Sequence, residues 1–330
     1  MKRIGVAGVA HIHMPNFATR LKARPGVEVV AVWDPEPVRA EKYAGELGCK
    51  VVSRVEDLWK EADAEAVVVC SETNRHKEIV LAAAAAGMDL FVEKPLGFSA
   101  ADAIEMAAAI ERAGVVFQTG YFMRGASVHR ELKRLVDGGV FGTVTRVRHV
   151  NCHSGSLGGW FDTDFRWMAD PAVAGCGAFG DLGTHSLDIL MWLFGKPESV
   201  TADISVVTGR YGETCDETGT ALLKFPGGAV GTLCGGWVDV MNPVTCEVSG
   251  TEGFAYIRNG ELFVKSDRLG TDGSAPWSEL PEALPHAFEL FLDALEGRDV
   301  PLVSASEAAQ RNVVMEALYR AARTHTWVSL

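Results

Sequence analysis

The first third of the chain alternates short apolar, β-branched runs with segments of helical pattern. This alternation predicts βαβ units, in which parallel strands lie side by side and helices cover both faces of the sheet. The predicted strands are Arg3–Val9, Val27–Trp33, Ala66–Cys70, Leu90–Val92 and Val115–Gln118. The predicted helices are Pro15–Ala23, Pro37–Leu47, Asn74–Ala86 and Ala100–Ala113.

Residues suited to helix ends support these boundaries. Glycines follow three of the helices directly, at Gly48, Gly87 and Gly114, where a left-handed cap is needed. Ser99 precedes the last of the four helices and is a candidate N-cap. The sequence therefore predicts a doubly wound α/β domain over residues 1–123.

The pattern changes after about residue 123. One helix is predicted over Ser127–Asp137, and a second over Ala305–Arg323 near the end of the chain. Between them the predicted strands are Thr143–Asn151, Ser199–Thr208, Thr218–Phe225, Ala229–Gly236, Thr245–Gly250 and Ala255–Arg258, with a loop at Gly270–Pro276. Turns such as Asn259-Gly260 favour antiparallel pairing. Residues 124–330 are thus predicted to form an α+β domain with an open, mostly antiparallel sheet.

Composition narrows the function classes. The chain has 330 residues, a net charge of −12 and no run rich in Lys or Arg, so a nucleic-acid partner is not expected. Its seven cysteines form no CxxC pair, which favours free thiols in a reducing compartment. No secretory pattern follows Met1, and no apolar stretch approaches the roughly 18–20 residues of a membrane span. We expect a cytoplasmic protein without a membrane partner.

The first predicted strand runs into a glycine turn, Gly8-Val9-Ala10-His11-Ile12-His13. This is a degenerate G-x-G-x-x-G, with Ala10 and His13 at the second and third glycine positions. The first glycine makes the tight turn, and a small second residue lets the backbone approach a pyrophosphate. The turn follows a strand and precedes a helix, as a dinucleotide site requires. His11 and His13 could also suggest a metal pair, but we expect them to contact the cofactor or pack, and we predict no metal site.

An acidic residue completes the dinucleotide pattern. Asp34 ends the second predicted strand, 21 residues after His13, near the offset of the acid that binds the ribose hydroxyls. A carboxylate at this place would repel a 2′-phosphate, so NAD is favoured over NADP. The alternative is an Asp that caps the next helix without binding a ligand.

Three further stretches carry a resemblance to a known family. They are Cys70-Ser71-Glu72-Thr73-Asn74-Arg75-His76, Glu93-Lys94-Pro95, and the segment from Gly175 to His185 that contains Asp181-Leu182-Gly183-Thr184-His185. Together with the glycine turn they resemble the glucose–fructose oxidoreductase, inositol dehydrogenase and rhizopine catabolism (Gfo/Idh/MocA) family over almost the whole chain. The resemblance implies a Rossmann domain followed by an α/β domain whose open sheet often builds dimers and tetramers. It also implies sugar or cyclitol substrates. The altered glycine turn and the doubled histidine depart from the family pattern.

Three residues form the predicted catalytic group. Lys94 follows a buried-looking strand at the carboxyl edge of the sheet, where ligands bind in doubly wound folds. Asp181 and His185 are four residues apart, which places both on one face of a helix. His185 is expected to take the hydroxyl proton, Lys94 to hold the substrate oxygen, and Asp181 to orient His185 or bind a neighbouring hydroxyl. The structural alternatives are a surface lysine, a capping Asp and a packed core histidine.

Other site residues follow from position along the chain. Further cofactor contacts are expected from residues after the strands of the first domain: Ile12, Ser71, Thr73, Asn74, His76 and Glu93. Substrate contacts are expected from polar and aromatic residues of both domains: Tyr121, Arg124, Asn151, His153, Trp160, Arg166 and Trp167. For each substrate residue, packing or a surface ion pair is an equal alternative.

These patterns predict an oxidoreductase that transfers a hydride between NAD and a hydroxyl carbon of a sugar or cyclitol. A homodimer or homotetramer is expected. Two alternatives remain open: an NAD-retaining glycosidase of the same fold, and a non-catalytic NAD-binding regulator. The glycosidase would copurify with its cofactor and form no net NADH, and the regulator would bind NADH without turning over any polyol.

Overall fold

The computed structural model describes all 330 residues and divides the chain into two compact units. Unit 1 comprises Met1–Tyr121, Phe161–Gly175 and Pro285–Val313, and unit 2 comprises Phe122–Trp160, Cys176–Leu284 and Val314–Leu330. The sequence prediction divides the chain once, between residues 123 and 124. In the structure two later segments also belong to unit 1, so each unit is assembled from three separate stretches.

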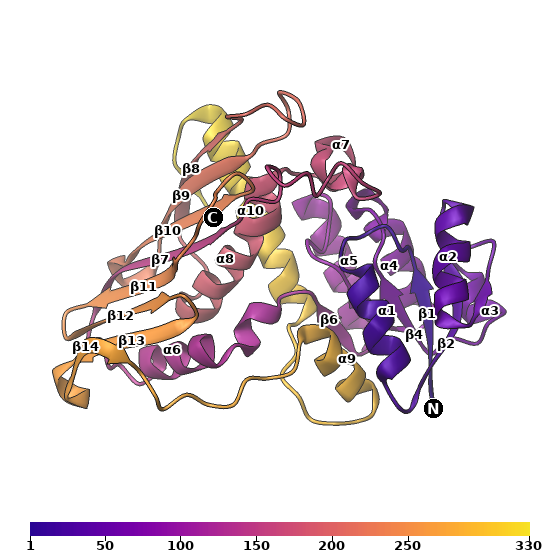
Figure 1. Cartoon of the computed structure of the whole chain (residues 1–330), viewed down its shortest axis with the longest axis horizontal. Coiled ribbons are helices and arrows are strands. Elements are labelled where there is room, and N and C mark those ends of the chain that lie inside the picture. Colours follow the sequence, from indigo (N-terminus) through magenta and orange to yellow (C-terminus); the bar gives the residue numbers. More distant parts are fainter. The chain divides into compact units, whose positions relative to one another are not determined.

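Unit 1 contains a six-stranded parallel sheet accompanied by helices such as α1, α2, α4 and α5 (Figure 1), and the strand order is β3-β2-β1-β4-β5-β6. The strands are β1 (Lys2–Ala7), β2 (Val27–Trp33), β3 (Lys50–Val51), β4 (Ala66–Val69), β5 (Asp89–Val92) and β6 (Phe117–Thr119). The predicted doubly wound sheet is therefore confirmed. Only the two-residue strand β3 had no counterpart in the sequence prediction, because it is too short to show an alternating pattern.

Helices accompany this sheet; the four that the sequence predicts are among them, and three others had no counterpart in the prediction. These helices are α1 (Met14–Ala23), α2 (Pro37–Leu47), α3 (Asp57–Lys60), α4 (His76–Ala85), α5 (Ala100–Ala113), α7 (Pro171–Ala174) and α9 (Ala287–Leu295). The predicted caps are confirmed at the ends of α2 and α5. Gly48 and Gly114 are left-handed, and the Ser99 hydroxyl accepts a hydrogen bond from the Asp102 amide at 3.1 Å.

Helix α9 packs into the core of unit 1 although it lies far along the chain. Its Phe288 ring stacks on Phe17 of α1, with ring centroids 4.3 Å apart and planes 9° from parallel. Phe288 also meets Phe91 of β5 edge to face at 4.9 Å. At the surface, the Arg24 guanidinium after α1 binds the carboxylates of Asp293 and Glu296 at 2.5 and 3.0 Å. Aromatic burial and this ion-pair group together fix α9 to α1.

Unit 2 is built on a nine-stranded sheet in the order β14-β13-β12-β11-β7-β10-β9-β8-β15. The strands are β7 (Val144–Cys152), β8 (Ser199–Ser205), β9 (Thr218–Lys224), β10 (Val230–Gly236), β11 (Val244–Gly250), β12 (Gly253–Arg258), β13 (Glu261–Ser266), β14 (Thr271–Pro276) and β15 (Val328–Ser329). Neighbouring strands are antiparallel except β7 and β10, which are parallel. The prediction of a mostly antiparallel sheet is confirmed.

One element of unit 2 corrects the sequence prediction. The segment Gly270–Pro276 was expected to be a loop because of its Gly, Ser, Asp and Pro content. In the structure Thr271–Pro276 is strand β14, which pairs with β13 at the edge of the sheet. An edge strand needs hydrogen bonds along one side only, so it tolerates the Gly and Pro residues that a central strand would not.

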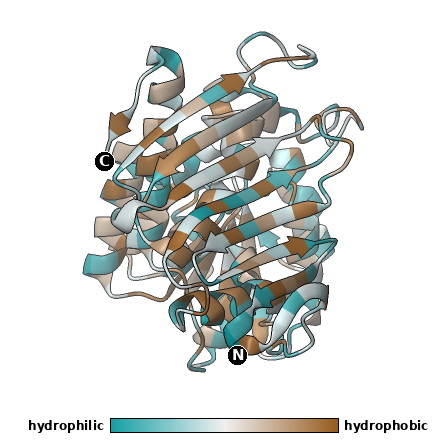
Figure 2. Ribbon diagram, turned by 90° about the vertical axis from the view of Figure 1, so that its left-hand side faces the viewer, coloured by the Kyte–Doolittle hydropathy of each residue, from teal (hydrophilic) through white to brown (hydrophobic).

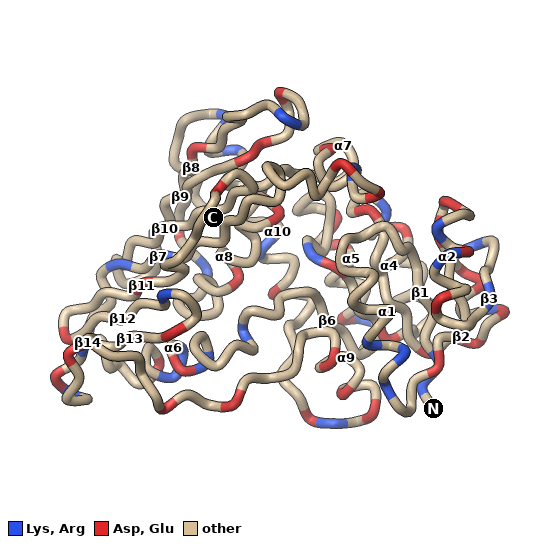
Figure 3. The backbone as a smooth tube through the Cα atoms, viewed as in Figure 1, with Lys and Arg blue, Asp and Glu red and all other residues tan.

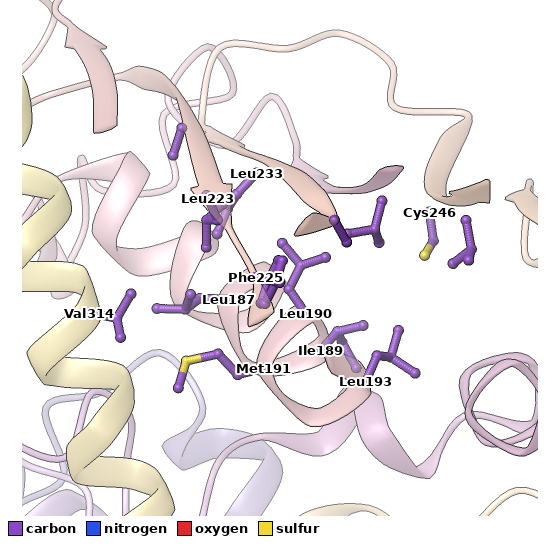
Figure 4. Close-up of a cluster of buried hydrophobic side chains, with 14 of the residues drawn as sticks. Leu187, Ile189, Leu190, Met191, Leu193, Leu223, Phe225, Leu233, Cys246 and Val314 are labelled. Atoms are coloured by element: carbon purple, nitrogen blue, oxygen red, sulfur yellow. The ribbon is translucent and has the colours of Figure 1, made fainter. Parts of the chain in front are cut away.

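Three helices line one face of this sheet: α6 (Ser127–Asp137), α8 (Ala178–Phe194) and α10 (Ala305–Thr324), the last of which begins in unit 1. The buried side chains of α8, including Leu187, Ile189 and Leu190, form the core with strand residues such as Leu223 and Leu233 (Figure 4). The opposite face of the sheet carries no helix of unit 2 (Figure 2). Short 3₁₀ helices occur at Thr73–Arg75, Phe122–Gly125, Arg166–Ala169, Pro226–Gly228 and Asp267–Leu269.

Two further features of the chain are the distribution of its charged residues and the apolar content of its helices. Basic and acidic residues are interspersed along the chain in both units (Figure 3). None of the helices combines the length and the apolar content that crossing a lipid bilayer would require.

Substitution of Phe288 tests the packing of α9. Phe288→Ala is expected to lower the free energy of unfolding by about 3–5 kcal/mol, because it removes a fully buried aromatic side chain and leaves a cavity. Urea unfolding followed by circular dichroism measures the change. Met241→Ala is the control, since this side chain is 76% exposed, and it should stay near the parent protein. A Phe288→Ala protein as stable as the control would contradict the packing described.

Candidate functional site

The turn after β1 has the geometry of a dinucleotide site. Gly8 has φ of +81°, and a Cβ at this position would lie 2.3 Å from the Cβ of Ser71. No other residue type fits this close approach. The turn leads into α1, whose first N–H groups face the space beyond the helix start, where an anion such as a pyrophosphate is stabilised. The glycine turn and the N-terminus of α1 therefore fit the dinucleotide that the sequence predicts.

Trp167 holds this turn from a distant part of the sequence. Its indole Nε1 donates a hydrogen bond to the Ala10 carbonyl at 2.9 Å, and its ring lies 5.9 Å from that of His11. The neighbouring Arg166 donates to the Ala169 carbonyl at 3.4 Å. The sequence marked Trp167 and Arg166 as substrate contacts. The structure places both in unit 1, with Trp167 against the glycine turn.

A buried carboxylate lies beside the two histidines of the turn. The Glu93 side chain is fully buried, and its Oε1 is 2.8 Å from His13 Nδ1 and 4.0 Å from His11 Nδ1. Burial alone would raise the pKa of Glu93, but His13 and His11 hold it well below its usual range. The ligand atoms of these three residues lie within 4.8 Å of one another, a spacing open to a metal ion. However, His11 Nδ1 already accepts a hydrogen bond from the His13 amide at 3.2 Å. The absence of a metal site stays a prediction.

Asp34 stands at the carboxyl end of β2 with its side chain buried. Its Oδ2 accepts a hydrogen bond from the Val9 amide at 2.8 Å, which ties it to the glycine turn. Its Oδ1 accepts from the Glu36 amide at 2.8 Å and from Arg39 Nε at 2.9 Å. Burial raises the pKa of Asp34, whereas these hydrogen bonds favour the charged form. The predicted ribose-binding acid is thus placed next to the turn.

The other predicted cofactor residues gather at the same edge of the sheet. Ser71 and Thr73 are buried directly after β4, and Asn74 is exposed beside them. His76 is buried at the start of α4, with Nδ1 3.2 Å from the Leu96 carbonyl, and burial lowers its pKa. Lys94, after β5, is only 4% exposed, and its amide donates to Glu93 Oε2 at 3.0 Å. This lysine is therefore not the surface residue of the structural alternative.

In unit 2 the helix α8 carries both Asp181 and His185. His185 is 4% exposed, and its ring lies 5.3 Å from that of Phe122. Asp181 Oδ2 accepts a hydrogen bond from the indole of Trp237 at 3.1 Å, and Trp237 is fully buried. One oxygen of this carboxylate is therefore fixed by the residue that follows β10, and the two side chains share one face of the helix as their spacing predicts.

A residue that sequence reasoning missed holds the start of α8. The buried carboxylate of Asp216 accepts hydrogen bonds from the Phe179 amide at 2.7 Å and from the Gly177 amide at 3.0 Å. The Tyr319 hydroxyl, from α10, donates to the same carboxylate at 2.9 Å. Asp216 thus satisfies the free amides at the N-terminus of the helix, as a cap from another part of the chain. Asp216 lies 37 residues along the chain from Phe179, so the sequence offered no local pattern for this cap.

The next residue, Glu217, closes a loop before β9. Its carboxylate accepts hydrogen bonds from the amides of Val207, Thr208 and Gly209 at 2.8, 2.5 and 3.2 Å. Burial alone would raise the pKa of Glu217, but these hydrogen bonds and that of the Thr208 hydroxyl lower it to about 2. Together the two acidic residues fix the segment that caps α8.

The remaining predicted substrate residues have varied surroundings. Tyr121 is 2% exposed at the end of unit 1. In unit 2 the Arg124 guanidinium binds both oxygens of Asp188 on α8, at 2.8 and 2.5 Å. The Asn151 amide donates to the Leu182 carbonyl at 3.3 Å. The rings of His153 and Trp160 lie 4.8 Å apart, and Trp160 is 50% exposed. Of these side chains, Trp160 is the most open to a ligand.

The fold and the glycine turn define a class of protein, one with a dinucleotide-binding Rossmann domain. Comparison with known families agrees. The family described as "Oxidoreductase family, NAD-binding Rossmann fold" matches residues 2–121, and the "GFO/IDH/MocA C-terminal domain" matches residues 129–256. The chain belongs to the Gfo/Idh/MocA family of oxidoreductases, and its first domain is an NAD-binding Rossmann domain. This confirms the resemblance seen in the sequence.

Individual relatives cover most of the chain. It is 28% identical to 1,5-anhydro-D-fructose reductase of Ensifer adhaerens over 98% of this chain and 97% of the relative. It is 34% identical to trans-1,2-dihydrobenzene-1,2-diol dehydrogenase of Oryctolagus cuniculus over 73% and 71%. The fold is similar to that of levoglucosan dehydrogenase in complex with NADH and levoglucosan, with a TM-score of 0.83, 20% identity and 99% coverage of both chains.

Removal of the Asp216 carboxylate tests its role as a cap. Asp216→Ala should lower the free energy of unfolding by at least about 2 kcal/mol, because buried donors lose their acceptor at about 1–3 kcal/mol each. Tyr319→Phe removes one of the three hydrogen bonds to this carboxylate and the bond that the hydroxyl accepts from the Gly180 amide, but it leaves the caps on Gly177 and Phe179 in place and should cost less. Thermal unfolding of the three proteins measures the order. Equal stability of Asp216→Ala and the parent protein would exclude the capping role.

The low pKa of Glu217 predicts a pH-dependent contribution to stability. The carboxyl titrates near 4.5 when unfolded and at about 2 when folded, so its contribution is complete above about pH 4.5 and is lost as pH falls toward 2. Glu217→Gln should therefore lower the unfolding free energy at pH 7, by an amount of order 2–3 kcal/mol. The difference from the parent should shrink between pH 4.5 and 2 in urea titrations. Glu213→Gln, at an exposed position in the same loop, is the control. A Glu217→Gln deficit independent of pH would contradict this assignment.

Proposed function

We propose that this NAD-dependent oxidoreductase acts on a ring hydroxyl of a sugar or cyclitol, with Lys94, Asp181 and His185 as its catalytic residues. The observation that carries the proposal is the buried imidazole of His185, one helical turn from the anchored carboxylate of Asp181. An imidazole titrates near neutral pH, so it can both accept and return a hydroxyl proton. The same chain also carries, in unit 1, the glycine turn of the dinucleotide site, which the proposed hydride transfer requires.

Each catalytic residue has a distinct role. In the oxidation direction neutral His185 accepts the proton of the substrate hydroxyl. Lys94 binds the oxygen and stabilises the negative charge that develops on it. Asp181, with one oxygen held by Trp237, binds a neighbouring hydroxyl or orients His185. The nicotinamide ring, when bound, supplies the hydride chemistry.

The cofactor and substrate residues are proposed on the same basis. Gly8, Ala10, Ile12 and the N-terminus of α1 would hold the pyrophosphate, and Asp34 the adenosine ribose. The half-exposed Trp160 would stack on the apolar face of a ring, as aromatic residues do with polyhydroxylated ligands. The names of the relatives, a reductase of an anhydro-sugar and a dehydrogenase of a cyclic diol, support a cyclic, hydroxylated substrate.

Assembly and compartment are proposed from the surface and the cysteines. Phe254, Tyr256 and Phe263 lie on the face of the sheet opposite the core, where the last two rings stack 4.7 Å apart. A homodimer or homotetramer built on this face would remove them from water, and light scattering tests it. All seven cysteines are free thiols, which supports the reducing cytoplasm.

The proposal is tested by substrate oxidation. NADH formation should be seen with NAD on at least one member of a panel of aldoses, inositols and anhydro-sugars, and more slowly with NADP. On that substrate His185→Ala should lower kcat by about 10²–10⁴-fold, the usual contribution of acid–base catalysis, with NADH affinity unchanged. His325→Ala, at an exposed position, is the matched control.

Other results would favour the alternatives. NADH binding without turnover on any member of the panel would indicate a regulator. Tightly copurifying NAD together with glycoside cleavage, and no net NADH, would indicate a glycosidase. An equal loss of NADH binding and kcat in His185→Ala would show that this histidine is structural.

A further inference from the structure

Arg39 binds Asp34, the predicted ribose-binding acid, and it is also held by a second carboxylate, that of Glu72. Arg39, in the first turn of α2, donates Nε to Asp34 Oδ1 at 2.9 Å and its terminal nitrogen to Glu72 Oε1 at 2.7 Å. Asp34 follows β2 and Glu72 lies three residues after β4. The guanidinium therefore bridges two loops that belong to different strands of one sheet.

The register of the sheet places these loops side by side. Ala7 of β1 pairs with Trp33 of β2 on one side and with Val69 of β4 on the other. Parallel strands that end at the same level have their following loops at the same edge of the sheet. Gly8, Asp34 and the segment that contains Glu72 therefore lie at one edge. This is the edge at which the glycine turn defines the dinucleotide site.

The charges of this group are not balanced. Asp34 and Glu72 are 6% and 9% exposed, and Arg39 is the positive charge that lies between them. Arg75 is farther from Glu72, at 3.7 Å, and it also approaches Glu78 at the same distance. Two nearly buried carboxylates thus share one close guanidinium. The Nε of Arg39 is engaged by Asp34, and its terminal nitrogen is engaged by Glu72.

An arginine near the end of β2 can in principle bind the 2′-phosphate of NADP. To do so, Arg39 would have to leave two carboxylates that are nearly buried, and a buried carboxylate without its partner is costly. The phosphate would also enter beside the negative charges of Asp34 and Glu72. The arrangement consequently disfavours the phosphorylated cofactor in two ways.

We propose that Glu72 is a specificity-determining residue of the cofactor site, because it holds Arg39 against Asp34 and so withholds this guanidinium from a 2′-phosphate. Glu72 acts through Arg39, as a positioning residue. The inference rests on the proposed contact between Asp34 and the adenosine ribose. It extends the choice of NAD from one carboxylate to a group of three residues, which lie on two loops and in the first turn of α2.

The test uses binding of ADP-ribose and of its 2′-phosphorylated form, measured by calorimetry on the full chain at fixed ionic strength. These ligands carry no nicotinamide, so the result is independent of turnover. Glu72→Gln should tighten binding of the 2′-phosphorylated ligand about tenfold, the change expected from one charge-assisted hydrogen bond. Binding of ADP-ribose should change by less than about threefold.

Two further variants distinguish the mechanism from a general charge effect. Glu78→Gln removes an equal charge from an exposed side chain, 3.7 Å from Arg75 and in no contact with Arg39, and should leave the ligand preference unchanged. In the double variant Glu72→Gln/Arg39→Ala the gain should disappear, because Arg39 is the group that would bind the phosphate.

The outcomes separate this inference from the proposed cofactor site. An unchanged preference in Glu72→Gln, an equal change in Glu78→Gln, or a gain that survives the loss of Arg39 would overturn the inference. If the parent protein binds neither ligand, the dinucleotide site itself is wrong. Thermal unfolding of each variant identifies a loss of folding, and Glu72→Asp, which keeps the charge, should retain the parent preference.

Discussion

The pairing of β1 with β2 and β4 is the constraint on which unit 1 depends. Because Ala7, Trp33 and Val69 stand at one level of the sheet, the turns that follow them share one edge. The missing side chain of Gly8 lets Ser71 approach, and the Asp34 carboxylate reaches back to the Val9 amide. A shift of one residue in the pairing of β1 with β2 would separate the turn from its acid, and a shift of β1 against β4 would displace Ser71 from Gly8.

In unit 2 the main constraint is that polar side chains are held on a helix that is buried on almost all sides. Helix α8 is the central helix of its core, and yet it presents Asp181 and His185. Buried partners that lie next to strands β9 and β10, and one from α10, stabilise this arrangement. Trp237 orients Asp181, and Asp216, itself bonded by Tyr319, satisfies the amides at the helix start. The polar residues are therefore positioned by side chains with little freedom to move.

Local patterns predicted most of this fold, and the failures have a common cause. Strands and helices with clear periodicity, such as β2, α2 and α5, were found with their observed bounds. Short or edge elements such as β3 and β14 lack such a pattern, because their structure depends on a neighbouring strand. The division of the chain into interleaved stretches, and the packing of α9 on α1, likewise depend on contacts between residues far apart in sequence, such as Trp167 with Ala10 and Phe288 with Phe17.

The candidate site shows the same limit. Asp34, Lys94, Asp181 and His185 could be named because each belongs to a short motif or to a family pattern. Asp216 and the link from Arg39 to Glu72 could not, because their hydrogen-bond partners lie 33 or more residues away in sequence. The interleaving of the chain has a practical consequence for making fragments. A piece ended near residue 123 would contain the whole parallel sheet, but it would expose the rings of Phe17 and Phe91 that α9 covers and would lose the indole that steadies the glycine turn. Neither unit can be produced as one uninterrupted stretch of the gene, so any separate expression of the nucleotide-binding part calls for a redesigned chain that joins its three pieces.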